Sequence, residues 1–295
     1  MAQLALGLAS LGRPAYINLG RDDALPADRS VEAMRAQCHR VLDTAYEAGV
    51  RWVDAARSYG LSEDFLASWL SDRGYDDITV SSKWGYAYVA DWRPDAEVHE
   101  VKEHSLARFT RQWQETRNLL GDAVSLYQVH SLTVDSPLFD DVELQAAMSN
   151  AGVPIGFSTS GPFQADTVRR ALDLGIFSAV QSTWNVLETS VGPALAEAHD
   201  AGLKVLVKEG LANGRLAVTP PAPIAETARE LGVGPDAVAL AAVLRQPWVD
   251  VVLSGAASPE QLLSNMDALN VQAELPSMAE SPEEYWTTRA ALPWD

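Results

Sequence analysis

Four polar side chains with complementary chemistry follow short runs of β-branched and aliphatic residues. They are Asp54, Tyr59, Lys83 and His130. A carbonyl that accepts a hydride develops negative charge on its oxygen and needs a proton donor held close to it. A phenol can supply that proton when a neighbouring ammonium lowers its pKa from about 10. A carboxylate can keep the ammonium charged, and an imidazole can hydrogen-bond the carbonyl oxygen. The four residue types match the groups that such a reaction needs.

The elements that must position these residues alternate along the chain. The predicted strands are Leu4–Gly7, Arg51–Val53, Ile78–Ser82, Val124–Val129, Val153–Phe157, Ala179–Gln181, Lys204–Val207 and Asp250–Leu253. The predicted helices are Ser30–Ala48, Glu63–Ser71, His99–Leu120, Leu138–Asn150, Phe163–Leu174 and Val191–Ala201. Several helices end at a glycine that the next strand follows at once, as at Gly49 and Gly202. This alternation indicates a parallel sheet that is buried on both faces.

Eight strands are the number that closes a barrel filled by side chains. A doubly wound open sheet is the alternative, but no Gly-x-Gly-x-x-Gly motif follows an early strand. We therefore predict an α/β protein with a single (β/α)8 TIM barrel over residues 1–295. A tail at 271–295 is expected to cover the face where the strands' C-terminal ends lie. Barrel enzymes carry their active sites at that face, so the polar residues at strand ends should gather there.

Composition excludes several classes of partner. The chain of 295 residues has 22 basic and 40 acidic side chains, a net charge of −18. An acidic surface repels phosphate backbones and anionic lipids, so neither a nucleic-acid nor a membrane partner is expected. The sequence shows no apolar run of about 18 residues and no basic leader before an apolar stretch. A lone Cys38 and the absence of zinc-type spacing argue against a disulfide and a metal site. We expect a cytoplasmic enzyme.

Seven short motifs follow one another along the chain. They are Asp54-x-Ala56-x-x-Tyr59-Gly60-x-Ser62-Glu63, Ser82-Lys83-x-Gly85, Leu126-Tyr127-Gln128-x-His130, Gly156-Phe157-Ser158, Gln181-x-x-x-Asn185, Gly214-Arg215-Leu216 and Gly255-Ala256-x-x-x-x-Gln261-Leu262-x-x-Asn265. In this order and spacing, the chain resembles the aldo-keto reductases over nearly its whole length. The resemblance implies an NAD(P)(H)-dependent oxidoreductase that reversibly reduces an aldehyde or ketone to an alcohol, or oxidises an alcohol or a sugar hemiacetal. It implies Tyr59 as general acid/base, supported by Asp54, Lys83 and His130.

The resemblance also implies a site for NAD(H) or NADP(H). The residues that it places around the cofactor are Ser158, Thr159, Gln181, Lys208, Gly210, Leu211, Gly255, Ala257, Gln261 and Asn265. Thr159 replaces the Asn that is usual in the family. Lys208 and Glu209 stand where the family often has a Tyr that stacks on the nicotinamide and a Ser. A carboxylate beside the pyrophosphate is repelled unless a cation offsets it, and we expect Lys208 or Arg215 to do so.

Members of the family that prefer NADPH place Arg or Lys in Gly-x-[Arg/Lys]-x-x-x-Gln-Leu, where it holds the 2′-phosphate. Residues 255–265 contain no basic residue, and Glu260 makes the segment acidic. A phosphate dianion binds best to charge-assisted donors. The sequence therefore predicts a weak preference for NADPH or a preference for NADH. Trp84 and Trp92 are expected to wall an apolar pocket for the small-molecule carbonyl or alcohol substrate.

Two other functions remain open at this point. One is a nicotinamide-binding sensor or regulatory subunit with little turnover, which the unusual residues Thr159, Lys208 and Glu209 keep in play. The other is a barrel hydrolase that binds no nicotinamide. The barrel fold alone does not separate these classes, because it supports many chemistries. Cofactor binding and turnover distinguish all three.

Overall fold

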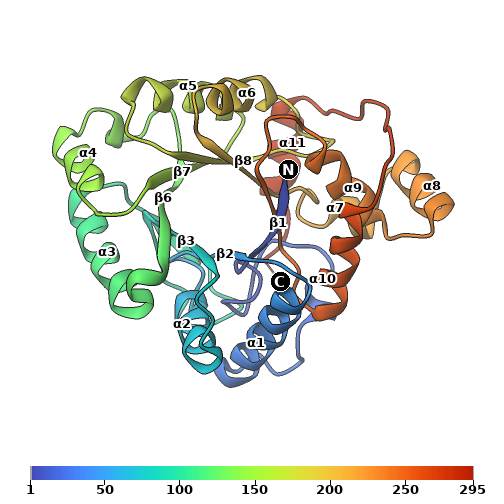
Figure 1. The fold of residues 1–295 in the computed structure, drawn as a ribbon, viewed down its shortest axis with the longest axis horizontal. Coiled ribbons are helices and arrows are strands. Elements are labelled where there is room, and N and C mark those ends of the chain that lie inside the picture. The colour runs from blue at the N-terminus through green and yellow to red at the C-terminus, as the bar shows by residue number, and fades with distance from the viewer. Residues whose placement is uncertain (1, 295) are drawn as a thin grey trace.

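The computed structural model describes residues 2–294 and shows eight parallel strands closed into a barrel (Figure 1). The strands are β1 (Gln3–Gly7), β2 (Trp52–Asp54), β3 (Thr79–Trp84), β6 (Val124–Leu132), β7 (Ile155–Thr159), β8 (Ala179–Thr183), β9 (Lys204–Lys208) and β10 (Val251–Ser254). They are hydrogen-bonded in the order β1-β10-β9-β8-β7-β6-β3-β2. Each of the eight predicted strands is confirmed, and the fold is the predicted (β/α)8 barrel.

Helices surround the barrel on the outside (Figure 1). They are α1 (Val31–Glu47), α2 (Ser62–Arg73), α3 (Leu106–Leu120), α4 (Val142–Ser149), α5 (Gln164–Leu174), α6 (Gly192–Asp200), α7 (Arg215–Val218), α8 (Ala222–Leu231), α9 (Pro235–Leu244), α10 (Pro259–Met266) and α11 (Pro282–Ala290). Short 3-10 turns lie at Asp22–Ala24, Gly121–Ala123, Pro137–Phe139 and Asp267–Leu269. Within residues 2–294, none of the helices has the length and apolar character needed to span a bilayer.

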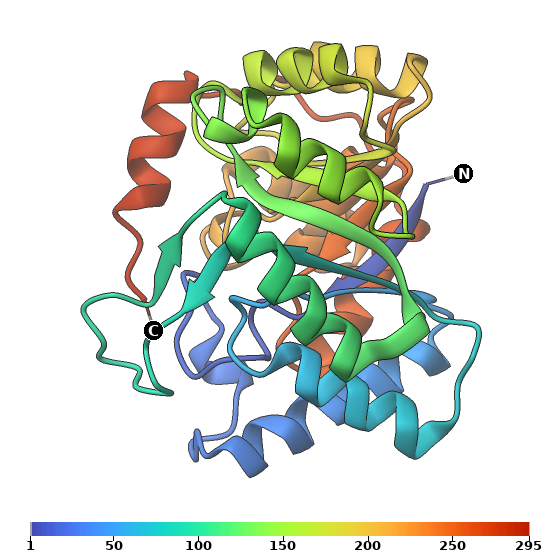
Figure 2. The same ribbon diagram turned by 90° about the vertical axis from the view of Figure 1, so that its left-hand side faces the viewer.

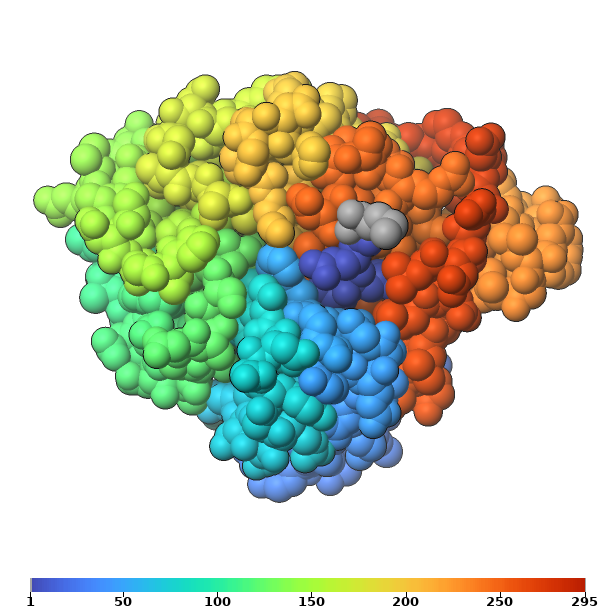
Figure 3. All heavy atoms as spheres, in the orientation of Figure 1, coloured from blue at the N-terminus to red at the C-terminus, as the bar shows by residue number. Residues whose placement is uncertain are grey.

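The barrel interior changes from apolar to polar along its axis. Seven buried apolar side chains form a cluster separate from the main core: Ala5, Trp52, Leu126, Ala179, Leu206, Val251 and Leu253. Figure 3 shows atoms closing the end of the barrel at which β1 begins. Alternate residues of a strand face the same side. The residues two positions beyond Trp52, Leu126 and Ala179 are therefore also internal, and they are Asp54, Gln128 and Gln181. The strands thus carry polar groups to the barrel's C-terminal face.

One predicted helix begins too early. The expected helix His99–Leu120 contains a strand at its start, because β5 (Glu100–Lys102) pairs antiparallel with β4 (Tyr86–Tyr88). Helix α3 begins only at Leu106, where the Ser105 side chain accepts a hydrogen bond from the Arg108 backbone N–H. Ser105 therefore caps the helix. His99 and His104 accordingly lie outside it.

The described part of the predicted 271–295 tail, residues 271–294, covers the C-terminal face of the barrel, as predicted. Its helix α11 contacts the loops after β8 and β9, since Tyr285 pairs with Asn185 and Arg289 with Glu209. Beyond α11, the Trp294 ring stacks on His99 next to β5, with the ring centroids 4.2 Å apart. Figure 2 shows the tail (red) running beside the β4–β5 hairpin (teal). The tail and the hairpin together border one side of the C-terminal face of the barrel.

A close backbone contact joins the loops after β1 and β2. The Leu61 N–H donates to the Gly12 carbonyl at 2.8 Å. A Cβ atom at Gly12 would lie 2.2 Å from the Tyr59 carbonyl oxygen and 2.6 Å from Cβ of Ser62. No side chain fits there without moving the backbone. Gly12 thus sets the position of the loop that carries Tyr59.

We predict that Gly12→Ala lowers the free energy of unfolding by about 1–3 kcal/mol, because the added methyl overpacks this contact. Gly7→Ala is the matched control, since its Cβ would come no closer than 3.5 Å to a neighbouring atom. It should change stability by less than about 0.5 kcal/mol. Urea denaturation of both variants measures the difference. Equal stability of the two variants would contradict the role given to Gly12.

Candidate active site

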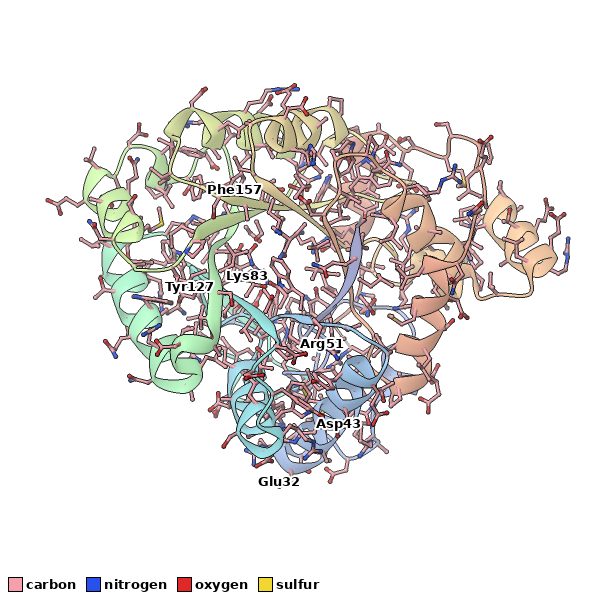
Figure 4. The ribbon with its side chains drawn as sticks, viewed as in Figure 1. Glu32, Asp43, Arg51, Lys83, Tyr127 and Phe157 are labelled. Atoms are coloured by element: carbon pink, nitrogen blue, oxygen red, sulfur yellow. The ribbon has the colours of Figure 1, made fainter. Side chains whose placement is uncertain are left out.

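A buried ion pair lies at the polar end of the barrel. The Lys83 ammonium pairs with Oδ2 of Asp54, and it also donates to the Ala55 carbonyl at 3.1 Å. The other carboxylate oxygen, Oδ1, accepts hydrogen bonds from the side chains of Ser81, Gln128 and Gln181 at 2.7, 3.1 and 3.4 Å. Both charged side chains are almost inaccessible to solvent. Figure 4 labels Lys83 inside the ring of strands.

Tyr59 and His130 lie beside this pair. The Lys83 ammonium is 4.8 Å from the centre of the Tyr59 ring, and the His130 ring is perpendicular to that ring at 5.4 Å. The Arg13 guanidinium lies 5.2 Å from the centre of the Tyr59 ring. The structure therefore brings Asp54, Tyr59, Lys83 and His130 together from three successive strand ends.

The protonation of Tyr59 differs from the sequence-based expectation. We expected the Lys83 ammonium to lower the pKa of the phenol. Burial instead raises the pKa of Tyr59 well above 10, the charge of Asp54 adds to this effect, and Arg13 opposes it. Desolvation of the phenolate outweighs the attraction of the nearby cations. Tyr59 consequently carries its proton throughout the neutral range.

His130 is held in its neutral form. Burial, and next the charge of Lys83, lower the pKa of His130 well below 6.5. Its Nδ1 lies 3.2 Å from the Ser58 hydroxyl. When that hydroxyl donates to Nδ1, the proton of the neutral ring resides on Nε2. His130 can then donate a hydrogen bond without being charged.

A cavity of about 270 Å³ extends away from Tyr59 and Asp54. It runs past the end of β9 and the loop that follows to the end of β10 and the start of α10. Of the ten predicted cofactor residues, it is lined by Gln181, Lys208, Gly210, Leu211, Gly255, Gln261 and Asn265. The cavity is also lined by three residues of the loop after β1, namely Tyr16, Asn18 and Leu19.

Three predicted cofactor residues lie outside the cavity lining. Ser158 Oγ accepts a hydrogen bond from the Ser131 backbone N–H at 2.8 Å. Thr159 Oγ1 lies 2.7 Å from the Ser182 hydroxyl, and both side chains are fully buried. Ala257 is buried, and its backbone N–H donates to Oε1 of Gln261 at 2.9 Å. Their polar groups are already paired within the protein.

The structure places both predicted substrate-pocket residues outside the lining of the cavity at Tyr59. Trp84 is fully buried against Phe109 of α3, with ring centroids 5.1 Å apart. Trp92 packs on Phe65, and its indole N–H donates to the Arg29 carbonyl at 2.7 Å. Neither ring lines the cavity at Tyr59. The tail residue Trp294 has its ring centre 5.1 Å from the guanidinium of Arg13, which also contacts Tyr59.

The loop after β1 forms a strap across the cavity, which the sequence pattern does not reveal. We use the name strap for residues 16–20. On one side the Leu19 N–H donates to the Asn213 carbonyl, and the Asn213 amide donates to the Ile17 carbonyl, both at 2.9 Å. On the other side Gln261 donates to the Gly20 carbonyl at 3.2 Å. The strap therefore joins the loop after β9 to α10.

The Glu209 carboxylate is neutralised by a residue that the sequence analysis missed. Arg289 of α11 binds it with Nε at 3.0 Å from both carboxylate oxygens, and Lys208 lies 3.7 Å away. Burial opposes ionisation, but these two cations outweigh it and lower the pKa of Glu209 to about 2. Burial lowers the pKa of Lys208 to about 8. Arg215, the other expected partner, pairs with Glu280 instead.

One buried polar atom at the cavity has no hydrogen-bond partner and fits a dinucleotide. Oδ1 of Asn213 is buried and has no hydrogen-bond partner within the described chain. Glu209, Ala212 and Asn213 have φ of 55°, 49° and 54°, a left-handed conformation that costs non-glycine residues energy and that clusters at ligand sites. A Cβ at Gly255 would meet nothing closer than 4.0 Å, so space remains for a ligand there. The free acceptor of Asn213 fits a hydroxyl donor of a nicotinamide dinucleotide, and the space at Gly255 leaves room for it.

Comparison with known proteins identifies the family of the chain. The model of the aldo/keto reductase family matches residues 4–280. An uncharacterised oxidoreductase of Bacillus subtilis, YqkF, is 22% identical over 79% of this chain and 82% of its own length. Protein tas of Escherichia coli is 27% identical over 83% of this chain and 88% of its own.

Solved structures show the same fold. Aldo-keto reductase AKR11C1 of Bacillus halodurans, in its holo form, superposes with a TM-score of 0.67 and 21% identity, over 98% of this chain and 91% of that one. The glycerol dehydrogenase AKR11B4 of Gluconobacter oxydans gives 0.69 and 19%, over 98% and 90%. The family match defines an oxidoreductase with this barrel. The chain belongs to the aldo/keto reductase family, whose members use NAD(P)(H).

We predict that Arg289→Met lowers the free energy of unfolding by about 2–4 kcal/mol, because it leaves the Glu209 carboxylate buried beside Lys208 alone. Arg169→Met is the matched control. Arg169 also binds Glu197 in a bidentate way, but both side chains are about half exposed. Its removal should cost less than about 1 kcal/mol. Urea denaturation compares them, and equal losses would refute the structural role of Arg289.

Proposed function

We propose that this oxidoreductase transfers a hydride between a nicotinamide dinucleotide and the carbonyl carbon of an aldehyde or ketone, with Tyr59 exchanging the proton at the oxygen. The reverse reaction oxidises an alcohol or a sugar hemiacetal. The observation that carries the proposal is the position of Tyr59. It faces the same cavity as Gln181 and Lys208, and its ring centre lies 4.8 Å from the Lys83 ammonium and 5.4 Å from the centre of the His130 ring.

In reduction, the protonated phenol of Tyr59 donates its proton to the carbonyl oxygen as negative charge develops there. The neutral ring of His130 donates a hydrogen bond to the same oxygen and orients it. As Tyr59 loses its proton, the Lys83 ammonium stabilises the phenolate, and Asp54 keeps that ammonium in place. The cations therefore act mainly on the charge that forms during the reaction, which is the condition for catalysis.

The dinucleotide supplies the hydride when it is bound. Gln181 and Lys208 would hold the nicotinamide end, because they share the cavity wall with Tyr59. Gly210 and Leu211, which follow at the turn after β9, would hold the pyrophosphate. Gly255, Gln261 and Asn265 would surround the adenosine. Ser158, Thr159 and Ala257 would act from behind the lining, as supports of the neighbouring residues.

The segment 255–265 has no basic side chain, so we propose a weak preference for NADPH or a preference for NADH.

A sensor with little turnover is the second candidate, and the strap favours it. Three hydrogen bonds hold residues 16–20 across the cavity on both sides. A dinucleotide enclosed in this way leaves only when the strap opens, and such a step can limit turnover. Tight binding with turnover far below about 1 per second, the low end for enzymes, would support the sensor over the reductase.

We predict that Tyr59→Phe lowers kcat for aldehyde reduction by about 10²–10⁴-fold, the usual contribution of a general acid. The Kd for the dinucleotide should stay within about twofold, because the ring and its contacts remain. Steady-state kinetics with a panel of aldehydes and aldoses measures the first quantity, and tryptophan fluorescence titration the second. Tyr46→Phe is the control, since Tyr46 stacks on Tyr75 away from the cavity. Full activity of Tyr59→Phe would refute the assignment.

We also predict that kcat for reduction is constant between about pH 5.5 and 7.5 at saturating substrate, the window around an ordinary histidine pKa. Tyr59 keeps its proton there because its pKa is raised, and His130 stays neutral because its pKa is lowered. Stopped-flow or steady-state rates across this range test the prediction. A sigmoidal change centred near pH 6.5 would show that His130 titrates normally and would contradict the proposed roles.

A further inference from the structure

The cavity that Tyr59 faces is also lined by a carboxylate. Asp236, in the first turn of α9, lines the cavity together with Ser254, Ser264 and Asn265. Its Oδ1 accepts a hydrogen bond from the Ser264 hydroxyl at 3.0 Å. The Asn265 amide lies between Oδ2 of Asp236, at 2.6 Å, and the Ser254 hydroxyl, at 2.7 Å. Two neighbouring side chains therefore fix the orientation of this carboxylate.

The backbone also makes room for the carboxylate. A Cβ at Gly234 would lie 2.1 Å from Oδ1 of Asp236 and 2.7 Å from the Ser264 hydroxyl. Only glycine at this position allows the carboxylate to fold back against its own helix start. The placement of Asp236 at the cavity wall thus depends on residues from two helices and the turn before α9.

The charge of Asp236 is not balanced as the other cavity charges are. Asp54 pairs with Lys83, and Glu209 pairs with Arg289 and Lys208. Among residues 2–294, no lysine or arginine lies within ion-pair distance of Asp236. The cavity wall at Asp236 is therefore negative, and the side chains that bind this carboxylate are the Ser264 hydroxyl and the Asn265 amide.

The direction of the dinucleotide follows from the proposed function, on which this inference rests. Hydride transfer requires the nicotinamide at Tyr59, so the adenosine extends toward Asp236 in the same cavity. NADP(H) differs from NAD(H) by a phosphate in place of the 2′-hydroxyl on the adenosine ribose. A carboxylate accepts a hydrogen bond from a ribose hydroxyl and repels a phosphate dianion. We propose that Asp236 is the residue that selects NAD(H) over NADP(H).

This assignment differs from the one that the sequence indicates. Glu260 is the acidic residue of the 255–265 segment, but it is exposed at the start of α10 and does not line the cavity. Asp236 lies more than twenty positions earlier in the chain and reaches the cavity only through the packing of α9 on α10. The two carboxylates therefore provide a variant and a matched control.

Tryptophan fluorescence titration of the whole protein with NADH and with NADPH tests the proposal. Wild type should bind NADH more tightly than NADPH by about tenfold or more, because like charges oppose NADPH. Asp236→Asn should reduce this ratio by about tenfold, mainly through tighter NADPH binding. Asp236→Ser, which also removes the charge, should shift the ratio in the same direction. Glu260→Gln should leave the ratio within about twofold.

The outcomes separate the inference from the function on which it rests. If both dinucleotides bind and neither Asp236 variant changes the ratio, the role of Asp236 is overturned while the proposed function stands. A wild type that binds NADPH more tightly than NADH also overturns the role of Asp236. If neither dinucleotide binds to the wild type at about 1 mM, the weak end of useful affinity, the proposed function itself fails, and the inference fails with it.

Discussion

The site depends on one ion pair, Asp54–Lys83, buried inside the barrel. Removing two charges from water costs several kcal/mol for each, and the pair persists only where further hydrogen bonds compensate. Here Ser81, Gln128 and Gln181 donate to the carboxylate. The carboxylate thus gathers groups from β2, β3, β6 and β8 at one level of the barrel. Its ammonium partner is fixed beside Tyr59 as a consequence.

Burial away from solvent explains why the proton donor is ready before a substrate binds. Burial favours the neutral forms of Tyr59 and His130, although Lys83 and Arg13 lie within about 5 Å of the Tyr59 ring. In this low-dielectric setting the same cations interact strongly with any negative charge that appears. The site is therefore neutral at the donor in the resting state and electrostatically prepared for a phenolate.

The barrel and the four candidate catalytic residues could be predicted from the sequence because their signals are local. Short aliphatic runs mark the strands, glycines mark the helix ends, and Asp54, Lys83 and His130 lie among the last residues of β2, β3 and β6. The burial of Trp84 was also within reach of a local rule. Neighbouring strand residues face opposite sides, so a Trp next to the inward-facing Lys83 must point toward the helix layer.

The remaining features depend on contacts between distant segments, which single-sequence patterns do not encode. Arg289 meets Glu209 across 80 residues, and the strap reaches Asn213 across almost 200. The β4–β5 hairpin was concealed because Ser105, an ordinary residue in the sequence, is the cap that delays α3. The lowered pKa expected for Tyr59 was wrong for a similar reason: burial is a property of the whole fold, whereas the nearby lysine was visible in the motif.

A crystal structure of the protein with bound NAD⁺ tests the central claim most directly, because the claim is that one cavity places the reactive ring of a dinucleotide at Tyr59. We predict the nicotinamide beside Tyr59, Gln181 and Lys208, and the adenosine between the strap and the start of α10. A dinucleotide bound in the reverse direction, or outside this cavity, would contradict the account.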